Sequence, residues 1–300
     1  MKTAMFHVKH AFAGEAEGVW PPSGRGLARF GGTLLRCGAL LAAGMVAACS
    51  SPADIAAGSG ITKAEAAAAT SAPAPAKVDF TDNERQGEAK RDFAYSWPAE
   101  VSAVPELAAR FTAERDKLLA EQKAEWQQSL KDFAGEDCAG CTMRDFQKTW
   151  DVVADLPRFL SLSASFYAYT GGAHGNGAFD ALVWDREAKA GFDPKAMFTS
   201  PDALQKALGG PWCNALKTER QKRLGPDYSD DGFFQCPPIA DLTVLAGSSG
   251  KRAFDRIGLI AAPYVAGSYA EGSYELTFPV TPAVLAAVKP EYKEAFAPGK

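Results

Sequence analysis

The chain has 300 residues, of which 47% are hydrophobic and 23% charged, a balance typical of globular proteins and unlike that of disordered or fibrous ones. At roughly 150 residues per domain, this length allows one large domain or two small ones. The formal net charge is −4, and no basic run occurs in the sequence. Nucleic acid is therefore not an expected partner, because phosphate contacts need clustered Lys and Arg.

The first 48 residues have the features of a secretory leader. An uncharged apolar run lies between Arg36 and Cys49, follows the basic residues Arg25 and Arg29, and ends in small residues. The run has about a dozen residues, fewer than the ~20 of a membrane-spanning helix. We therefore expect residues 1–48 to be a signal peptide that is removed.

The end of this leader, Val46, Ala47, Ala48 and Cys49, resembles a bacterial lipobox. The resemblance implies cleavage before Cys49 and acylation of its thiol and of the new amino terminus, for example with palmitate, which anchors the protein stably in a membrane. The alternative is a plain secretory signal with a chance cysteine. Ser50, and not Asp, follows the cysteine, which resembles a Gram-negative outer-membrane signal. We expect a lipoprotein of the cell envelope that faces the periplasm from the outer membrane.

A linker of low complexity follows the cysteine. From Ser50 to Lys77, 22 of 28 residues are Ala, Ser, Pro, Gly or Thr, and none is aromatic. We assign residues 49–79 to the lipidated cysteine and a disordered tether, with transient helix over 63–70. Removal of the leader leaves 27 basic and 34 acidic side chains, a net charge of −7. This charge argues against a second, electrostatic contact with a membrane.

Residues 80–300 are predicted to form one domain, with an N-terminal part over 80–158 and a C-terminal part over 159–300. The first predicted element is an edge strand over Phe93–Trp97 that Pro98 ends. A helix of about 28 residues follows from Pro105 to Phe133, because apolar residues recur there at helical spacing and proline suits a first helical turn.

Clean alternation over Phe159–Tyr169 predicts a half-buried strand, and Ala178–Trp184 completes a hairpin around the sequence TGGAHGNG. Two helices with proline in the first turn are expected at Pro201–Leu208 and Pro211–Leu224. The remaining predicted elements are the strands Leu242–Ala246, Phe254–Ala261 and Tyr274–Val280 and the short helix Pro282–Val288. This order predicts an α+β fold, a mostly antiparallel sheet with a long N-terminal helix and inserted helices packed on one face.

Enzyme signatures are absent from the sequence. His174 is the only histidine after the leader, which excludes histidine-rich metal sites, and no Gly-x-Ser-x-Gly elbow, phosphate-binding Walker loop or His-Glu-x-x-His helix occurs. Three aspartates, Asp227, Asp230 and Asp231, are read as a solvated turn and not as a catalytic pair. We therefore predict no metal, no cofactor and no enzymatic activity.

Four cysteines remain beside Cys49, and an even number in an oxidising compartment predicts disulfides. Of three pairings, we favour Cys138 with Cys141 and Cys213 with Cys236, which closes a loop of about 24 residues. Two alternatives stay open, a redox-active pair in the sequence CAGC and a four-cysteine zinc site.

The segment FYAYTGGAHGNG at 166–177, followed by Met197 and Phe198, resembles the strand and glycine turn of RsiV-like domains. Further matches occur in the same order: FAYSWP at 93–98, APYVAGSYAEGSYELTFPV at 262–280 and KPEYKEAF at 289–296. The resemblance covers about residues 80–297. It points to the cell wall, since one relative is the extracellular part of a lysozyme-binding anti-sigma factor and another is a domain that accompanies peptidoglycan deacetylases. The separate catalytic domain of the deacetylases is not found here.

The glycine turn is the first candidate binding element. Gly171, Gly172 and Gly175 permit positive backbone dihedral angles, so the turn can be sharp and can bring backbone amides close to a ligand. His174 lies within this turn. It is either a ligand-facing imidazole, which could act as a general base, or a histidine that bonds the backbone and fixes the hairpin.

Tyrosines form the second candidate binding element. Tyr167, Tyr169, Tyr264 and Tyr269 occur in the segments of strongest resemblance, and aromatic faces with hydroxyl tips suit sugar rings or a protein partner. The alternative is that they only fill strand positions that favour tyrosine. We thus expect a non-enzymatic binding module for a cell-wall glycan or an envelope protein partner, including a lysozyme-like protein. The alternative is a hydrolase or deacetylase-related enzyme that uses His174.

Overall fold

The computed structural model describes residues 74–225 and 235–299. All of them belong to one compact unit, Ala72–Lys300. The predicted leader, Cys49, nearly all of the tether and the three aspartates of the predicted solvated turn lie outside the described residues. Within the part of the chain that is described, no helix is long and apolar enough to cross a membrane.

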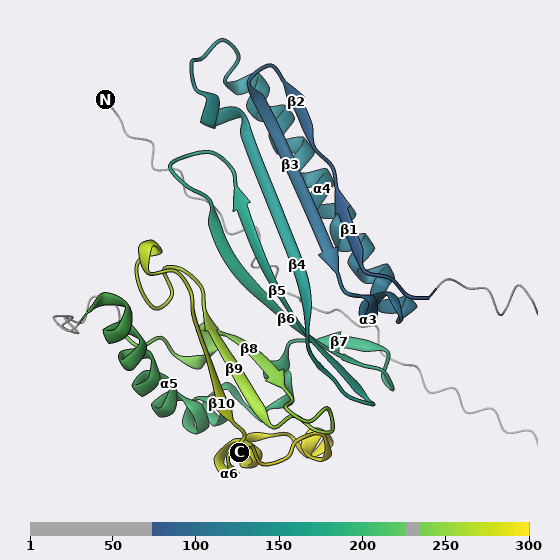
Figure 1. Cartoon of the computed structure of the whole chain (residues 1–300), viewed down its shortest axis with the longest axis vertical. Coiled ribbons are helices and arrows are strands. Elements are labelled where there is room, and N and C mark those ends of the chain that lie inside the picture. Colours follow the sequence, from purple (N-terminus) through teal and green to yellow (C-terminus); the bar gives the residue numbers. More distant parts are fainter. Residues whose placement is uncertain (1–73, 226–234, 300) are drawn as a thin grey trace, which may run out of the picture. The chain divides into compact units, whose positions relative to one another are not determined.

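The larger of two sheets has seven strands in the order β1-β3-β4-β5-β6-β7, and β2 pairs with β3 (Figure 1). Its strands are β1 (Val78–Thr81), β2 (Glu84–Gln86), β3 (Ala89–Trp97), β4 (Met143–Asp155), β5 (Phe159–Tyr169), β6 (Asn176–Asp185) and β7 (Ala190–Phe192). The pair β3–β4 is parallel, because helix α4 (Pro105–Asp132) carries the chain back between them, and the other pairs are antiparallel. The predicted α+β class is confirmed.

A second, antiparallel sheet has the order β10-β9-β8. Its strands are β8 (Thr243–Gly247), β9 (Arg256–Ala261) and β10 (Tyr274–Pro279). The other helices are α3 (Ala99–Ser102), α5 (Pro201–Leu224) and α6 (Pro282–Ala287), and short 3-10 turns are η1 (Ala139–Thr142), η2 (Pro194–Met197), η3 (Ile239–Asp241), η4 (Tyr269–Glu271) and η5 (Pro290–Ala295). The predicted strands are thus divided between two sheets.

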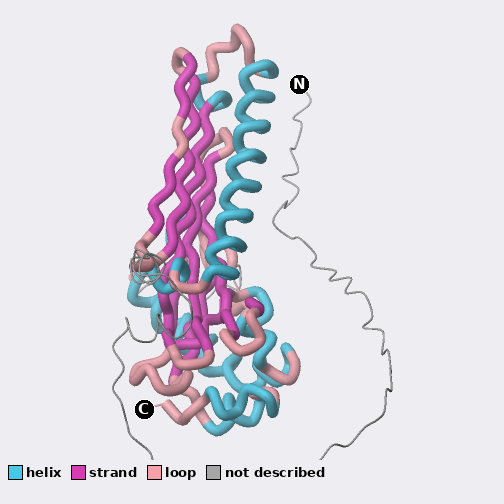
Figure 2. Tube along the Cα trace, turned by 90° about the vertical axis from the view of Figure 1, so that its right-hand side faces the viewer, coloured by secondary structure: helices cyan, strands magenta, loops and turns pink. Residues whose placement is uncertain are grey.

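Helix α4 runs along one face of the larger sheet, here called the inner face (Figure 2). It begins with Pro105, whose missing N–H costs nothing in a first turn, and it buries Leu107, Phe111 and Trp126. The Phe111 ring stacks on that of Trp150 in β4, with centroids 4.6 Å apart. This aromatic core fixes the helix to the sheet.

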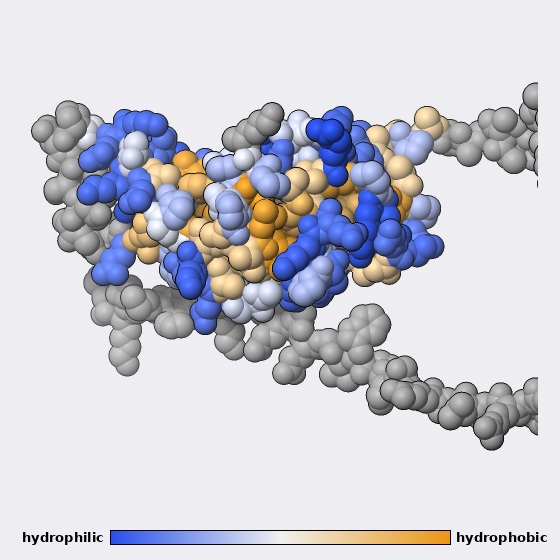
Figure 3. All heavy atoms as spheres, turned by 90° about the horizontal axis from the view of Figure 1, so that it is seen from below, coloured by the Kyte–Doolittle hydropathy of each residue, from blue (hydrophilic) through white to orange (hydrophobic). Residues whose placement is uncertain are grey.

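A second core lies between the other face of the larger sheet, here called the outer face, and the second sheet. Phe159 of β5 and Val183 of β6 pack there with residues of α5 and the second sheet, including Trp212 and Phe254. Because successive strand residues point to opposite faces, the β5–β6 hairpin contributes to both cores. From the C-terminal side, hydrophobic residues reach the surface near the middle and hydrophilic ones surround them (Figure 3).

Two sequence-based predictions are wrong. The strand over Phe93–Trp97 is not an edge strand, since β3 lies between β1 and β4. The helices Pro201–Leu208 and Pro211–Leu224 are one helix, α5, with Pro211 in its interior. Every fourth residue on either side of Pro211 is buried, namely Leu208, Trp212 and Leu216. The free energy gained by burying these side chains offsets the destabilising effect of proline inside a helix.

Strand β4 was not predicted from the sequence. Its inner positions include two cations, Arg144 and Lys148, beside Phe146 and Trp150, so the pattern of apolar alternation is broken. Both cations are nevertheless buried. Because of these charges, the sequence pattern did not predict a strand that lies in the middle of the sheet.

Both favoured cysteine pairs are at disulfide distance. The Cα atoms of Cys138 and Cys141 are 5.4 Å apart, and those of Cys213 and Cys236 are 5.5 Å apart. The first pair joins the residue before η1 to a residue within it, and the second joins α5 to the chain before η3.

Candidate functional site

The turn between β5 and β6 requires glycine. Gly171 and Gly172 have φ angles of 102° and 97°, a region that residues with a side chain rarely adopt. The hydroxyl of Tyr169 donates a hydrogen bond of 2.8 Å to the carbonyl of Gly172 and so closes the turn over the end of β5.

Gly175 is required for a different reason, the close approach of an aromatic ring. A Cβ atom at this position would lie 2.4 Å from the ring of Tyr167. The ring can therefore lie flat on the backbone at the start of β6. This contact holds Tyr167 on the outer face, next to the glycine turn.

The second element of the site is the loop between β9 and β10, residues 262–273. The carboxylate of Glu271 accepts hydrogen bonds from the Ser268 backbone N–H and from the Tyr274 hydroxyl, each of 2.7 Å. Arg223 of α5 donates to the carbonyls of Glu271 and Ser273 over 2.9 and 2.6 Å. Burial acts to raise the pKa of Glu271, but the hydrogen bonds outweigh it and hold the pKa below its usual value.

This loop places two tyrosines against the histidine of the glycine turn. The rings of His174 and Tyr269 are stacked with centroids 4.0 Å apart and an angle of 21° between their planes. The ring centroid of Tyr264 lies 6.3 Å from that of His174 and 5.7 Å from that of Tyr269, and the angles between the ring planes are 25° and 32°. We call these three nearly parallel rings the aromatic platform. Tyr264 is 53% exposed, so the platform is open to solvent.

His174 contacts the turn through one ring nitrogen and the loop through the other. Its Nδ1 lies 2.9 Å from the Gly175 carbonyl, which can only accept, so Nδ1 donates this hydrogen bond. Nε2 lies 3.2 Å from the Tyr264 hydroxyl, within hydrogen-bond distance. Tyr264 itself has a φ of 71°, which is strained for a bulky residue.

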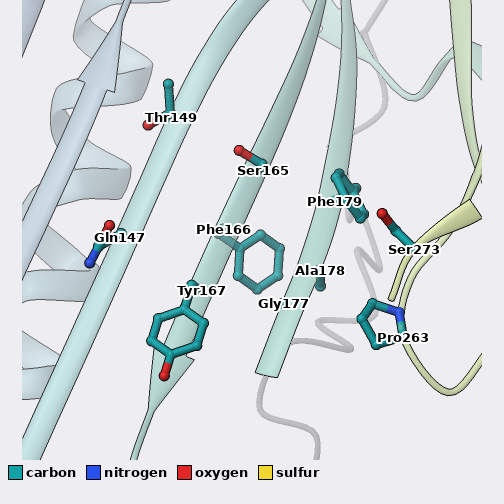
Figure 4. Close-up of a pocket in the computed structure, with 10 residues that line it drawn as sticks. All are labelled: Gln147, Thr149, Ser165, Phe166, Tyr167, Gly177, Ala178, Phe179, Pro263 and Ser273. Atoms are coloured by element: carbon teal, nitrogen blue, oxygen red, sulfur yellow. The ribbon is translucent and has the colours of Figure 1, made fainter. Parts of the chain in front are cut away.

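A groove with a volume of about 290 Å³ is lined by residues of both of these segments, including Tyr167, whose ring contacts Gly175, and Pro263, which precedes Tyr264 (Figure 4). We call it the binding groove. Its floor is the outer face of the larger sheet, and Figure 4 shows Pro263 and Ser273 of the β9–β10 loop on its far side. The lining side chains from the sheet include Gln147, Thr149, Ser165, Tyr167 and Phe179. The residues labelled in Figure 4 are uncharged, so the groove offers hydroxyl, amide and aromatic groups.

The structure brings the predicted site residues to one end of the hairpin. Tyr167, Tyr169 and the glycines come from the β5–β6 turn, and Tyr264 and Tyr269 come from the other loop, about 90 residues away in sequence. Within the described residues, no group of three or more His, Cys, Asp or Glu side chains could hold a metal ion.

Apart from Tyr167, sequence analysis did not identify the residues that form the floor of the groove. Ser165 lies on the polar side of a strand whose alternation was recognised, and this position was a usable signal. Gln147 and Thr149 lie on β4, which was not predicted, and Pro263 and Ser273 reach the groove only through the packing of the second sheet.

Comparisons with known proteins match part of this chain. Residues 81–177, which include β3, β4, β5 and the glycine turn, match the family model described as Deacetylase PdaC. No curated protein matches. The chain is similar to the crystal structure of a DUF3298 family protein from Pseudomonas aeruginosa PAO1, with 19% identity, a TM-score of 0.46, and coverage of 76% of this chain and 99% of that one. A DUF3298 family member from Bacteroides fragilis is 13% identical with a TM-score of 0.43, covering 68% and 90%.

Proposed function

We propose that this protein is a lipid-anchored module of the bacterial envelope that binds a cell-wall glycan without chemical conversion. The observation that carries the proposal is the aromatic platform together with an uncharged binding groove that is built from the same two chain segments. Sugar rings present C–H faces that pack on aromatic rings, and their hydroxyls can bond Gln, Ser and Thr side chains. The groove supplies both kinds of group.

The strained backbone of Tyr264 supports a binding role. A positive φ at a bulky residue costs about 1–3 kcal/mol and persists only where the surroundings impose it. Here the hydrogen bonds of Glu271 and Arg223 hold the loop. The loop, held in this way, keeps the Tyr264 ring in the platform and half exposed, a position that a ligand can use.

A second candidate is an enzyme related to the deacetylase that the matching family model names. The observation that favours it is the 3.2 Å contact between His174 Nε2 and the Tyr264 hydroxyl at the platform. Among the described residues, the polar partners of the imidazole are this hydroxyl and the Gly175 carbonyl, and no carboxylate orients the ring as in a catalytic triad. We therefore prefer binding. A lysozyme-like protein is the alternative partner.

Titration calorimetry of the full chain against solubilised peptidoglycan fragments and against lysozyme tests the proposal. We expect saturable binding of fragments, which mass spectrometry recovers unchanged. Tyr269→Ala should weaken binding about tenfold, since it removes a stacked ring worth about 1.4 kcal/mol. Phe133→Ala, at an exposed aromatic residue after α4, is the control and should bind normally.

Each other result has a definite meaning. Binding of lysozyme but not of fragments would replace the glycan by a protein partner. Cleaved or deacetylated fragments, with turnover lost in His174→Ala, would establish the enzyme instead. No binding of either would refute the proposal.

A further inference from the structure

Arg144 is a buried cation without an ion-pair partner among the described residues. The residue is 8% exposed and lies on the inner face of β4. Nη1 donates to the carbonyls of Cys141 and Met143 over 3.0 and 2.7 Å. Nε is buried without an acceptor. Burial lowers the pKa of Arg144, although the charges of Glu125 and Tyr169 act against this shift from beyond ion-pair distance.

Two other cations on the same face are paired. Arg91, the cross-strand neighbour of Arg144, contacts the carboxylates of Asp82 and Glu84. Lys148 contacts Glu114 and Asp180, each over 2.5 Å. A buried charge without a counter-ion is costly. Of these three cations, Arg144 alone has no carboxylate of the described residues within ion-pair distance.

The guanidinium lies beside the glycine turn, on the inner face of the sheet, whereas the binding groove lies on the outer face. A Cβ atom at Gly171 would be 3.8 Å from Nη1 of Arg144 and 3.5 Å from the Gly140 carbonyl, so the glycine turn lies directly beside the guanidinium. From Gly171 to His174 is three residues, which span at most about 10 Å. The Arg144 side chain and the aromatic platform therefore flank the same turn.

We infer that Arg144 binds a carboxylate carried by the glycan ligand, on an acidic sugar or on a peptide attached to it. The inference rests on the proposed function and adds the charge of the ligand to it. Nη1 is occupied by carbonyls, so Nη2, for which the described residues provide no acceptor, is the donor that meets the carboxylate. A charge-assisted hydrogen bond of this kind is among the stronger polar contacts in proteins.

The test compares three ligands by calorimetry on the full chain: a neutral N-acetylglucosamine oligomer, a disaccharide-peptide with free carboxylates, and the methyl ester of that disaccharide-peptide. The wild type should bind the free acid about tenfold more tightly than the ester, the effect of one hydrogen bond to a charged group. Arg144→Gln should abolish this preference and leave the affinity for the neutral oligomer unchanged. Arg256→Gln, at a half-exposed arginine that pairs with its neighbour Asp255, is the control and should keep the preference.

The outcomes separate this inference from the proposed function. Equal affinity of the wild type for acid and ester overturns the inference, while binding of the neutral oligomer still supports the glycan site. Binding of no ligand overturns both. If Arg144→Gln does not fold, Arg144→Lys retains the buried charge but not the planar fork, and it should reduce the acid preference at least threefold. A folded variant of either kind that keeps the full preference refutes the role of Arg144.

Discussion

At the level of single residues, contacts with groups distant in sequence determine the geometry of the site more than the local sequence pattern does. Gly175 has no unusual φ angle, yet the ring of Tyr167 occupies the space of its Cβ. The His174 ring is likewise held in position by its contacts with the Gly175 carbonyl and the Tyr264 hydroxyl. The turn and the platform are thus one packed assembly.

Gly175→Ala should disturb this assembly. The added methyl group would have to displace the Tyr167 ring, and we expect a loss of about 1–3 kcal/mol in the free energy of unfolding together with weaker glycan binding. Chemical denaturation measures the first effect and calorimetry the second. Gly210→Ala, at an exposed helix position with no atom near its Cβ, is the control and should change stability by less than about 1 kcal/mol. Equal effects of the two variants would contradict the packing argument.

Among the secondary-structure elements, the β9–β10 loop depends on one carboxylate. Glu271 accepts from Ser268 and Tyr274, and its pKa is lowered in the folded state. A carboxylate with a lowered pKa stabilises the fold above the pKa of the unfolded chain, about 4.3, and this contribution is lost as the pH falls toward the folded pKa.

Glu271→Gln should therefore destabilise the protein at pH 7, since the variant has no carboxylate to accept both hydrogen bonds. The difference in melting temperature between wild type and variant should shrink as the pH falls below about 4.3. Thermal unfolding from pH 7 to pH 3 measures it. A difference that stays constant over this range would show that the charge of Glu271 does not hold the loop.

The two disulfides should contribute unequally. In the chain-entropy model, the bond with a sequence separation of 23, Cys213–Cys236, stabilises by about 3 kcal/mol, and the bond with a separation of 3, Cys138–Cys141, by about 2 kcal/mol. Denaturation of the two double Cys→Ser variants measures these values. A larger loss from the shorter loop would indicate that η1 supports the glycine turn beyond its loop closure.

On the scale of the whole molecule, the long β5–β6 hairpin connects the two cores. Its alternating side chains enter the aromatic core under α4 on one face and the core of the second sheet on the other. The binding groove lies where the second sheet leaves the outer face of the hairpin uncovered. The site is therefore a product of the packing of the second sheet on the first.

The predicted membrane anchor lies outside the described residues. We expect Cys49→Ser to shift the protein from the membrane fraction to the soluble fraction, because it removes the acylated thiol of the predicted lipobox. Fractionation with immunodetection measures the shift, and Cys138→Ser together with Cys141→Ser is the control. Unchanged membrane association would contradict the lipoprotein prediction.

The sequence by itself determined the local elements and the turn. Proline and helical spacing predicted α4, alternation predicted β5 with its bounds, and the glycines marked the hairpin, because these signals act over a few residues. Tertiary structure alone decided that Pro211 lies inside one helix, that β4 with two buried cations is a central strand, and that Tyr264 stacks near His174. These depend on contacts between residues distant in sequence, whose packing energy outweighs local preference. The unsatisfied Nε of Arg144 likewise became visible only once its neighbours were known.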